Sequence, residues 1–476
     1  MALKKNQIIS LEITAASSDG NGIGRYTDAD HPAGLVVFVP YTAVGDTIEC
    51  RITKVEKNCA FGRIERLTAA SVDRVADTGC PVFGKCGGCA WRHISYETEL
   101  RYKQEHVTDC IRRIAKLDTP VLPIVGSPSD SAYRNKAQYP VAAGEKPLIG
   151  FYAPRSHRVV PQRECALQPA VFTTILNTVA DWMEQEHVSA YDEETHRGLV
   201  RHIYIRQAEQ TGELMVCLVC TSGKLPQPDK LVDALRRIDG VASILVNLNR
   251  EKTNVILGKN TFPLWGKETV TDTLCGLRFR LSPLSFYQVN RRGAERLYGL
   301  AADFAELKST DTLLDLYCGT GTIGLSMASR VREVIGAEIV PAAVEDARRN
   351  AEENGIQNAR FLCADAAEAA AQLEEEGLTP DVVVVDPPRK GCDQAVLETI
   401  SRMAPSRLVY ISCNPATLAR DLARLAELGY TATKIQPVDM FPRTAHVESV
   451  VCLSREKADD YIRISVQTKD LQTNSN

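Results

Sequence analysis

Three glycines follow a strand-like apolar run in the sequence TLLDLYCGTGTIG, spaced as Gly319-x-Gly321-x-x-Gly324. Glycines at this spacing let the backbone turn tightly and bring the N–H groups of a following helix close to a ligand. Glu338 ends the next predicted strand, where a carboxylate can accept hydrogen bonds from ribose hydroxyls. The pattern predicts a nucleotide-like cofactor, a property that NAD-dependent enzymes share.

Three later strand-like runs also end in an acidic or reactive residue: Asp365 in RFLCAD, Asp386 in DVVVVDPPRKG and Cys413 in LVYISCNPAT. The carboxyl ends of the strands in an open α/β sheet line the ligand crevice, so we expect these side chains to converge there. A helix N-cap is a reasonable alternative for any single acid. It is a poor explanation for several acids in register.

Cys413 is a candidate nucleophile because of its position. A buried cysteine is usually an inert small apolar residue. Cys413 instead ends a predicted strand and is followed by Asn414-Pro415 and a helix, whose N-terminal dipole would favour a thiolate.

A second group of cysteines has the spacing Cys80-x5-Cys86-x2-Cys89. It supplies three thiolates, whereas an iron–sulfur cluster or a structural zinc ion needs four ligands. The Gly87-Gly88 pair is compatible with backbone that wraps tightly around a metal centre. The spacing alone does not choose between the two kinds of site.

Composition sets the frame for these motifs. The chain has 476 residues, 44% of them hydrophobic and 24% charged, which predicts a soluble protein of two or three domains. No apolar run approaches the roughly 18 residues of a membrane helix, and no signal peptide is apparent, so we expect a cytoplasmic protein without a membrane partner. Fifteen cysteines in such a chain favour reduced thiols over disulfides.

Charge is unevenly distributed along the sequence. Residues 80–165 carry 13 Lys and Arg against 8 Asp and Glu, whereas residues 309–452 carry 13 against 21. A basic middle beside an acidic C-terminal half is compatible with a polyanion held between domains, and ordinary surface variation explains it equally well.

The pattern of elements predicts three domains and a tail. Residues 1–68 contain five short alternating strands, typical of an OB-type barrel. Residues 69–290 read as a mixed α+β domain, and residues 291–455 alternate regularly between strands and helices, which predicts a doubly wound parallel sheet closed by a final antiparallel pair. Residues 456–476 form a polar tail.

The sequences DPPRKG, SCNPATLARDL and FPRTAHVESVV resemble the RNA uracil-5-methyltransferase family, whose catalytic domain has the class I S-adenosylmethionine-dependent fold. The resemblance implies that Cys413 attacks C6 of uracil and that Glu448 removes the C5 proton. The chemistry explains the need for a thiolate, because uracil C5 attacks a sulfonium methyl group only after addition at C6 creates an enolate.

The resemblance covers nearly the whole chain and implies further sites. It assigns cofactor contacts to Gln288, Tyr317, Glu338 and Asp386, to which the strand-end argument adds Asp365. It also implies that the N-terminal barrel is a TRAM domain. A [4Fe–4S] cluster would use Cys80, Cys86 and Cys89 with Cys165 as the distant fourth ligand, and the rival fourth ligand, Cys110, falls within a predicted helix.

The barrel and the cluster together resemble enzymes that act on 23S rRNA more than those that act on tRNA, so we expect a monomeric enzyme that methylates 23S rRNA. A tRNA uracil-5-methyltransferase is the alternative. A DNA cytosine-5 methyltransferase typically has its nucleophile in a Pro-Cys-Gln context, in place of Ser412-Cys413-Asn414. An iron–sulfur RNA-binding regulator would have no use for Cys413, and a NAD-dependent oxidoreductase would have no use for a Cys413–Glu448 pair.

Overall fold

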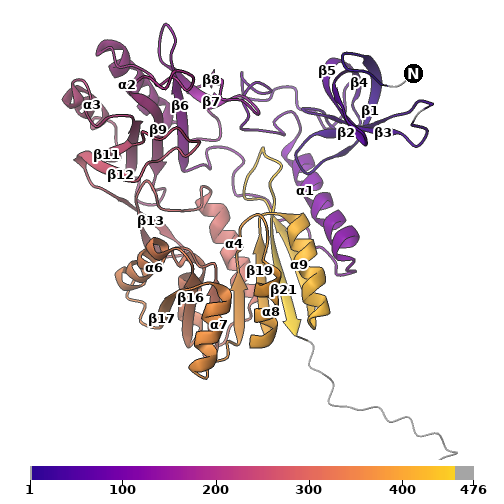
Figure 1. The fold of residues 1–476 in the computed structure, drawn as a ribbon, viewed down its shortest axis with the longest axis vertical. Coiled ribbons are helices and arrows are strands. Elements are labelled where there is room, and N and C mark those ends of the chain that lie inside the picture. Colours follow the sequence, from indigo (N-terminus) through magenta and orange to yellow (C-terminus); the bar gives the residue numbers. More distant parts are fainter. Residues whose placement is uncertain (1–2, 30, 456–476) are drawn as a thin grey trace, which may run out of the picture.

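The structure is a computed structural model that describes residues 3–29 and 31–455. A small barrel and a central sheet lie side by side above the C-terminal sheet (Figure 1). The predicted polar tail, 456–476, lies outside the described residues. No described helix is long and apolar enough to cross a membrane.

The N-terminal domain is a closed five-stranded barrel in the order β1-β2-β3-β5-β4, as the sequence predicted. Inward-facing side chains alternate with exposed ones, and Val37, Ile48 and Ile52 are fully buried in its core. The strands are β1 (Ile8–Ala16), β2 (Gly22–Tyr26), β3 (Leu35–Val39), β4 (Thr47–Val55) and β5 (Cys59–Ala69).

The central domain is a seven-stranded sheet in the order β12-β11-β10-β9-β6-β7-β8, in which only β10 and β11 pair in parallel. Its strands are β6 (Lys136–Ala142), β7 (Leu148–Tyr152), β8 (Val159–Pro161), β9 (Val200–Gln207), β10 (Leu214–Cys220), β11 (Val241–Leu248) and β12 (Asn260–Gly266). Helices α2 (Val171–Gln185) and α3 (Pro228–Leu235) share one apolar core with this sheet. A hairpin, β13 (Val270–Leu274) and β14 (Leu277–Leu281), leads to the C-terminal domain.

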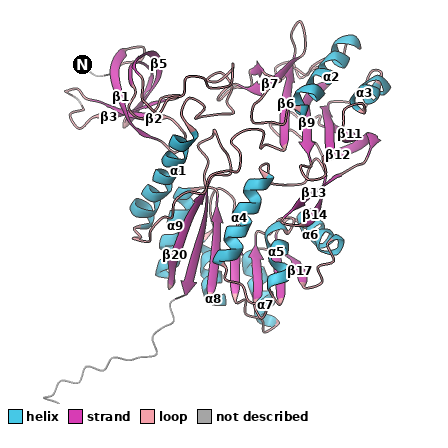
Figure 2. Cartoon of the chain, turned by 180° about the vertical axis from the view of Figure 1, so that it is seen from behind, coloured by secondary structure: helices cyan, strands magenta, loops and turns pink. Residues whose placement is uncertain are grey.

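The C-terminal sheet has the order β17-β16-β15-β18-β19-β21-β20, with β21 antiparallel to both of its neighbours. The chain starts in the middle at β15, runs outward to β17 and returns to β18, so β15 and β18 flank the switch point where such sheets bind ligands. Helices cover this sheet (Figure 2). The elements are α4 (Arg291–Phe304), β15 (Thr312–Leu316), α5 (Thr322–Met327), β16 (Glu333–Glu338), α6 (Pro341–Glu353), β17 (Ala359–Cys363), α7 (Ala366–Glu375), β18 (Val382–Val385), α8 (Gln394–Met403), β19 (Arg407–Ser412), α9 (Pro415–Glu427), β20 (Tyr430–Val438) and β21 (Glu448–Arg455).

Helix α1 (Tyr96–Cys110) joins the barrel to the C-terminal sheet. It continues as a short π-helix (Ile111–Ala115), and both pack against α9. Val107 and Ile111 are buried in the core of the C-terminal sheet, and residues 121–125 run beside β20. A helix that the sequence places within segment 69–290 therefore belongs by packing to the C-terminal sheet, because its apolar stripe faces α9.

Asp46 holds the segment that leaves the barrel. We predict that Asp46→Ala lowers the free energy of unfolding of the barrel by about 2–3 kcal/mol. Its buried carboxylate pairs with Arg74 at 2.7 Å and accepts from the Ala43 and Ser71 amides. Burial raises the Asp46 pKa, but these partners outweigh it and hold the pKa below its ordinary value. The stabilisation should therefore be present at neutral pH and be lost as the pH falls through the depressed pKa.

Native-state hydrogen exchange of the barrel amides measures this effect. Glu49→Ala, which removes an exposed pair with Arg66 on the same barrel, is the matched control and should leave exchange unchanged. Equal exchange in the two variants would contradict the role assigned to Asp46.

Candidate active site

The glycine loop joins β15 to α5 at the switch point. Tyr317 and Gly321 adopt left-handed backbone with φ of 62° and 80°. The Gly324 amide donates to Asp315 at 2.8 Å, and a Cβ at Gly324 would lie 2.9 Å from the same carboxylate oxygen, so only glycine allows this close approach. Burial raises the pKa of Asp315 to about 7, with the charges of Asp386 and Glu338 adding to the rise. The loop therefore sits on a buried carboxyl group.

Glu338 holds the rim of this loop. One of its carboxylate oxygens accepts from the Gly319 amide at 3.1 Å and the other from the Val340 amide at 2.9 Å. Each oxygen keeps a free lone pair that a hydroxyl group could use. Ile339 beside it is 68% exposed, which leaves an apolar surface next to the carboxylate. A ribose with an attached flat ring would match this arrangement.

Asp365 serves as a helix cap. Its carboxylate accepts from the Ala367 and Glu368 amides, and Glu368 completes a capping box at the start of α7. The side chain is exposed at the edge of the crevice. Helix capping accounts for this acid without a cofactor.

Gln288 and Asp386 meet around Tyr298, a buried residue of α4 that the sequence analysis missed. Burial raises the pKa of Tyr298, the charge of Asp386 adds to the rise, and hydrogen bonds with Thr322 and Gln288 oppose it. The Tyr298 hydroxyl lies 3.5 Å from the Thr322 hydroxyl. Burial also raises the pKa of Asp386 to about 7. Only the packing of α4 against the glycine loop reveals Tyr298, since its sequence position reads as an ordinary helical core residue.

Cys413 lies between the end of β19 and the start of α9. The Asn414 side chain caps α9, accepting from the Ala416 amide at 3.0 Å, and its amide group donates to the Arg389 carbonyl at 3.2 Å. The cap therefore ties the loop after β18 to the cysteine.

Glu448 is the first residue of β21 and is 8% exposed. In the antiparallel pair of β19 and β21, Ser412 lies opposite Ser449. Continuing this register by one residue brings Cys413 and Glu448, separated by 35 positions in the sequence, to the same place at the sheet edge. The two predicted catalytic residues are thus brought together.

The charges of these groups act on one another. Burial raises the pKa of Cys413 to about 11, and the charges of Glu448 and Asp386 contribute to the rise. Burial and Asp386 raise the pKa of Glu448 to about 8. Arg389 lowers both values. Arg389 lies in the DPPRKG motif, and its effect on these two pKa values arises only from the tertiary arrangement of the strand ends.

The four expected cluster cysteines are all partly buried, and they act on each other through their charges. Burial chiefly raises the pKa of Cys89 to about 11; the charges of Cys165 and Cys86 add to this, and Arg92 and Arg134 oppose it. Within the described part of the chain, however, no three His, Cys, Asp or Glu side chains are arranged to hold a metal ion.

Cys110, the rival fourth ligand, lies elsewhere. It is buried with α9 in the core of the C-terminal sheet, and its Sγ lies 3.9 Å from Nδ1 of His106. Burial and the charge of Asp109 raise the pKa of Cys110 to about 11, and Cys80, Cys86 and Cys89 do not contribute to this rise. The structure therefore groups Cys165, and not Cys110, with the segment 80–91 that carries Cys80, Cys86 and Cys89 and is called the cysteine loop.

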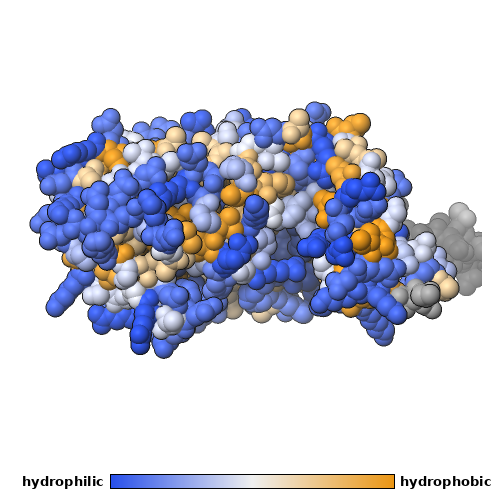
Figure 3. All heavy atoms as spheres, turned by 90° about the horizontal axis from the view of Figure 1, so that it is seen from above, coloured by the Kyte–Doolittle hydropathy of each residue, from blue (hydrophilic) through white to orange (hydrophobic). Residues whose placement is uncertain are grey.

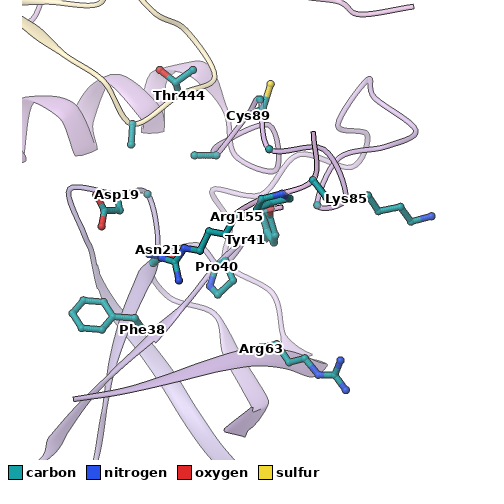
Figure 4. A pocket seen from close by; sticks show the side chains of 18 of the residues that line it. Asp19, Asn21, Phe38, Pro40, Tyr41, Arg63, Lys85, Cys89, Arg155 and Thr444 are labelled. Carbon is teal, nitrogen blue, oxygen red and sulfur yellow. The ribbon is translucent and has the colours of Figure 1, made fainter. Parts of the chain in front are cut away.

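A groove of about 1120 Å³ runs between the barrel, the cysteine loop and residues 444–446. Seen from above, the mostly hydrophilic surface is hollowed between the central sheet and the barrel (Figure 3). Five cationic side chains and three aromatic ones line the groove, several of them drawn in Figure 4: Arg63, Lys85, Arg134, Arg155, Arg158, Phe38, Tyr41 and Phe61. Cations with interleaved aromatic rings are the surface that single-stranded nucleic acid binds.

Comparison with known proteins agrees with this fold. A family model described as tRNA (Uracil-5-)-methyltransferase matches residues 265–456, and a TRAM domain model matches residues 2–64. An RNA methyltransferase of Clostridium tetani, described as uncharacterized, is 41% identical over 95% of this chain and 97% of its own length. A similarly described protein of Halalkalibacterium halodurans is 43% identical over 95% and 98%.

Among solved structures, the Pyrococcus abyssi tRNA (uracil-54, C5)-methyltransferase in complex with S-adenosyl-L-homocysteine matches with a TM-score of 0.74 and 28% identity, over 94% of this chain and all of that one. The fold and these matches define an S-adenosylmethionine-dependent RNA methyltransferase with a TRAM barrel. More narrowly, the chain belongs to the RNA uracil-5-methyltransferase family, which confirms the resemblance found in its motifs.

The charge coupling predicts opposite shifts in Cys413 reactivity. Glu448→Gln removes a negative charge and should lower the pKa of Cys413, whereas Arg389→Gln removes the opposing positive charge and should raise it. The pH dependence of Cys413 alkylation by iodoacetamide, followed by peptide mass spectrometry, measures both. Cys217, which is fully buried in β10, serves as an internal reference that should stay unmodified. Shifts in the same direction would rule out the proposed arrangement.

Proposed function

We propose that this enzyme transfers a methyl group from S-adenosylmethionine to C5 of a uracil in RNA, with Cys413 as nucleophile and Glu448 as base. The observation that carries the proposal is the register of β19 and β21, which pairs Ser412 with Ser449 and so brings the next residue on each side, Cys413 and Glu448, to the same sheet edge. A thiol and a carboxyl group side by side at the crevice are what addition to C6 and proton removal from C5 require.

Attack begins with loss of the Cys413 proton. Since its pKa is raised, the free enzyme holds a thiol at neutral pH, and a nearby carboxylate must take the proton. Asp386, with a pKa of about 7, is ionised often enough to do so. Arg389 and the N-terminus of α9 then stabilise the thiolate. As the S–C6 bond forms, the C5–C6 double-bond electrons move onto C5 and the oxygen of the neighbouring C4 carbonyl.

S-adenosylmethionine, when bound, supplies a methyl group that C5 takes from the sulfonium. C5 then carries both the methyl group and a proton. Glu448 removes this proton, the double bond re-forms and the thiolate leaves C6. A pKa of about 8 suits this step, because a general base works best when its pKa lies near the operating pH.

The proposed cofactor site is the crevice at the switch point. Glu338 would receive the ribose hydroxyls and Ile339 would cover one face of the adenine, while the Tyr317 backbone shapes the loop. Gln288 and Asp386, which both act on the pKa of Tyr298, would face the methionine end of the cofactor. We assign no cofactor contact to Asp365, because its carboxylate caps α7.

We propose that the RNA lies in the groove between barrel and cysteine loop. His446, two residues before Glu448, lines the groove, so a strand lying in it would pass close to the catalytic pair. The favoured substrate is 23S rRNA, because the combination of a barrel and a cysteine loop resembles the enzymes that act on 23S rRNA. A tRNA is the second candidate, favoured by the tRNA named for the family model and the Pyrococcus abyssi structure.

The cysteine loop and Cys165 would hold a [4Fe–4S] cluster. Each cysteine of such a cluster binds a different iron, so the sulfurs stand farther apart than around a single ion. This spacing suits thiols that raise each other's pKa but form no single-ion site in the described part of the chain. Arg92 and Arg134 would balance the anionic cluster. Methyl transfer needs no electrons, and the proposed role is structural.

The two catalytic variants should accumulate different species on labelled RNA. Cys413→Ala should form neither adduct nor product, because no thiolate attacks C6. Glu448→Gln should still attack and methylate but release slowly, by roughly 10²–10⁴ for a lost general base, so a cofactor-dependent covalent band should appear on a denaturing gel.

Unmodified 23S rRNA and unmodified tRNA, offered separately, identify the substrate. A band on rRNA alone supports the favoured assignment, and a band on tRNA alone overturns it. Adduct formation by Cys413→Ala on either RNA would remove Cys413 from its role.

Anaerobically purified protein should be brown and contain about four irons, by the composition of the cluster. Cys165→Ser should lose this iron, while Cys110→Ser, a matched control in the apolar core beside α9, should retain it. Iron loss from the Cys110 variant alone would reassign the fourth ligand, and stoichiometric zinc would overturn the cluster.

A further inference from the structure

The loop of residues 439–447 connects β20 to β21 and leads directly into Glu448. It projects from the C-terminal sheet towards the space between barrel and central sheet, near α1 (Figure 1). It contains no helix or strand. Its position, and with it the start of β21, therefore depends on contacts with other segments.

The first contact is a buried ion cluster. Lys103 of α1 places its Nζ 2.7 Å from a Glu99 oxygen and 2.7 Å from a carboxylate oxygen of Asp439, and all three side chains are fully buried. The same ammonium group donates to the Phe441 carbonyl at 3.2 Å. A lysine has three donors, and here each has an acceptor, two of them in the loop.

Tyr96 completes the cluster. Its hydroxyl donates to the second oxygen of Asp439 at 2.8 Å and accepts from the Ser127 amide at 2.8 Å. The Phe441 amide donates to the first oxygen of Asp439 at 3.0 Å. Both oxygens of the carboxylate at the start of the loop are thus held in one orientation.

The middle of the loop is fixed by the same helix. Arg443 has left-handed backbone, with φ of 69°, and its amide donates to Glu99 at 2.8 Å. Its carbonyl accepts from the amides of Ala90 at 2.9 Å and Trp91 at 3.3 Å, next to Cys89. One loop therefore ties α1, the cysteine loop and β21 together.

We propose that Lys103 and Tyr96 are positioning residues for uracil methylation: through Asp439 they hold the 439–447 loop so that Glu448 stays at Cys413. This inference rests on the proposed role of Glu448 as the base. A buried ion cluster is weak evidence for stability, but its directional bonds select one arrangement that apolar packing would leave open. A small displacement of a catalytic group is enough to slow its step strongly.

The decisive experiment compares two tyrosines of α1. Tyr96→Phe removes the bond to Asp439, whereas the control Tyr102→Phe removes a bond from the Val44 amide, which links the same helix to the barrel. With labelled RNA in single turnover, Tyr96→Phe should slow product release about tenfold and accumulate the methylated adduct. Adduct formation and the dissociation constant of S-adenosylmethionine should stay within about twofold of wild type, and Tyr102→Phe should change neither step.

Lys103→Met should accumulate more adduct than Tyr96→Phe; if it fails to fold, Tyr96→Phe decides alone. Wild-type release in Tyr96→Phe, or adduct formation and release slowed in parallel, would overturn the positioning role. Glu448→Gln separates the two proposals. If it accumulates adduct and Tyr96→Phe does not, only the positioning role fails, and if Glu448→Gln accumulates none, the base assignment fails with it.

Discussion

The reversed strand β21 is the constraint on which the site depends. Parallel strands bring only their carboxyl ends to the crevice, so they supply Glu338, Asp386 and Cys413. An antiparallel strand inserted beside β19 brings its first residue to the same edge, and that residue is Glu448. A shift of one residue in this register would turn the carboxyl group to the other face of the sheet.

The crevice places three acidic groups close together in a poorly solvated environment. Burial raises the pKa of Asp386 to about 7, of Glu448 to about 8 and of Cys413 to about 11. The positive charge of Arg389 keeps the pKa values of Glu448 and Cys413 from rising further. A reaction that first removes a thiol proton and later a carbon proton is served by such a graded set, because each carboxyl group can exchange a proton near neutral pH.

The central sheet shares one apolar core with the C-terminal domain, and two loops connect the catalytic sheet to the segment that follows the barrel. The cysteine loop donates its Ala90 and Trp91 amides to the 439–447 loop, and both loops line the groove. Helix α1 crosses from the barrel to α9 and carries the buried Lys103. A nucleic acid strand in the proposed groove would thus touch the barrel, the cysteine loop and residues 444–446 together, and in this way the small barrel would contribute to binding.

The sequence by itself determined the features that local interactions control. Five alternating strands indicated the barrel, and strand–helix alternation with its glycine loop indicated the doubly wound sheet, because side-chain periodicity and turn residues act within a few positions. The motifs around Cys413 and Glu448 identified the family. The helix cap at Asp365 is also a local interaction. The sequence shows that Asp365 can cap a helix, but only the structure shows that its carboxylate does so.

Tertiary structure alone decided which distant residues meet. Tyr298 beside Asp386, Arg389 acting on Glu448, and Lys103 bound to Asp439 across 336 positions leave no periodic trace in the sequence. Helix α1 has an apolar stripe in the sequence, but the stripe does not say whether the central or the C-terminal sheet will cover it. The physical reason is that periodicity specifies which face of an element is buried, whereas the partner of that face depends on the packing of the whole chain.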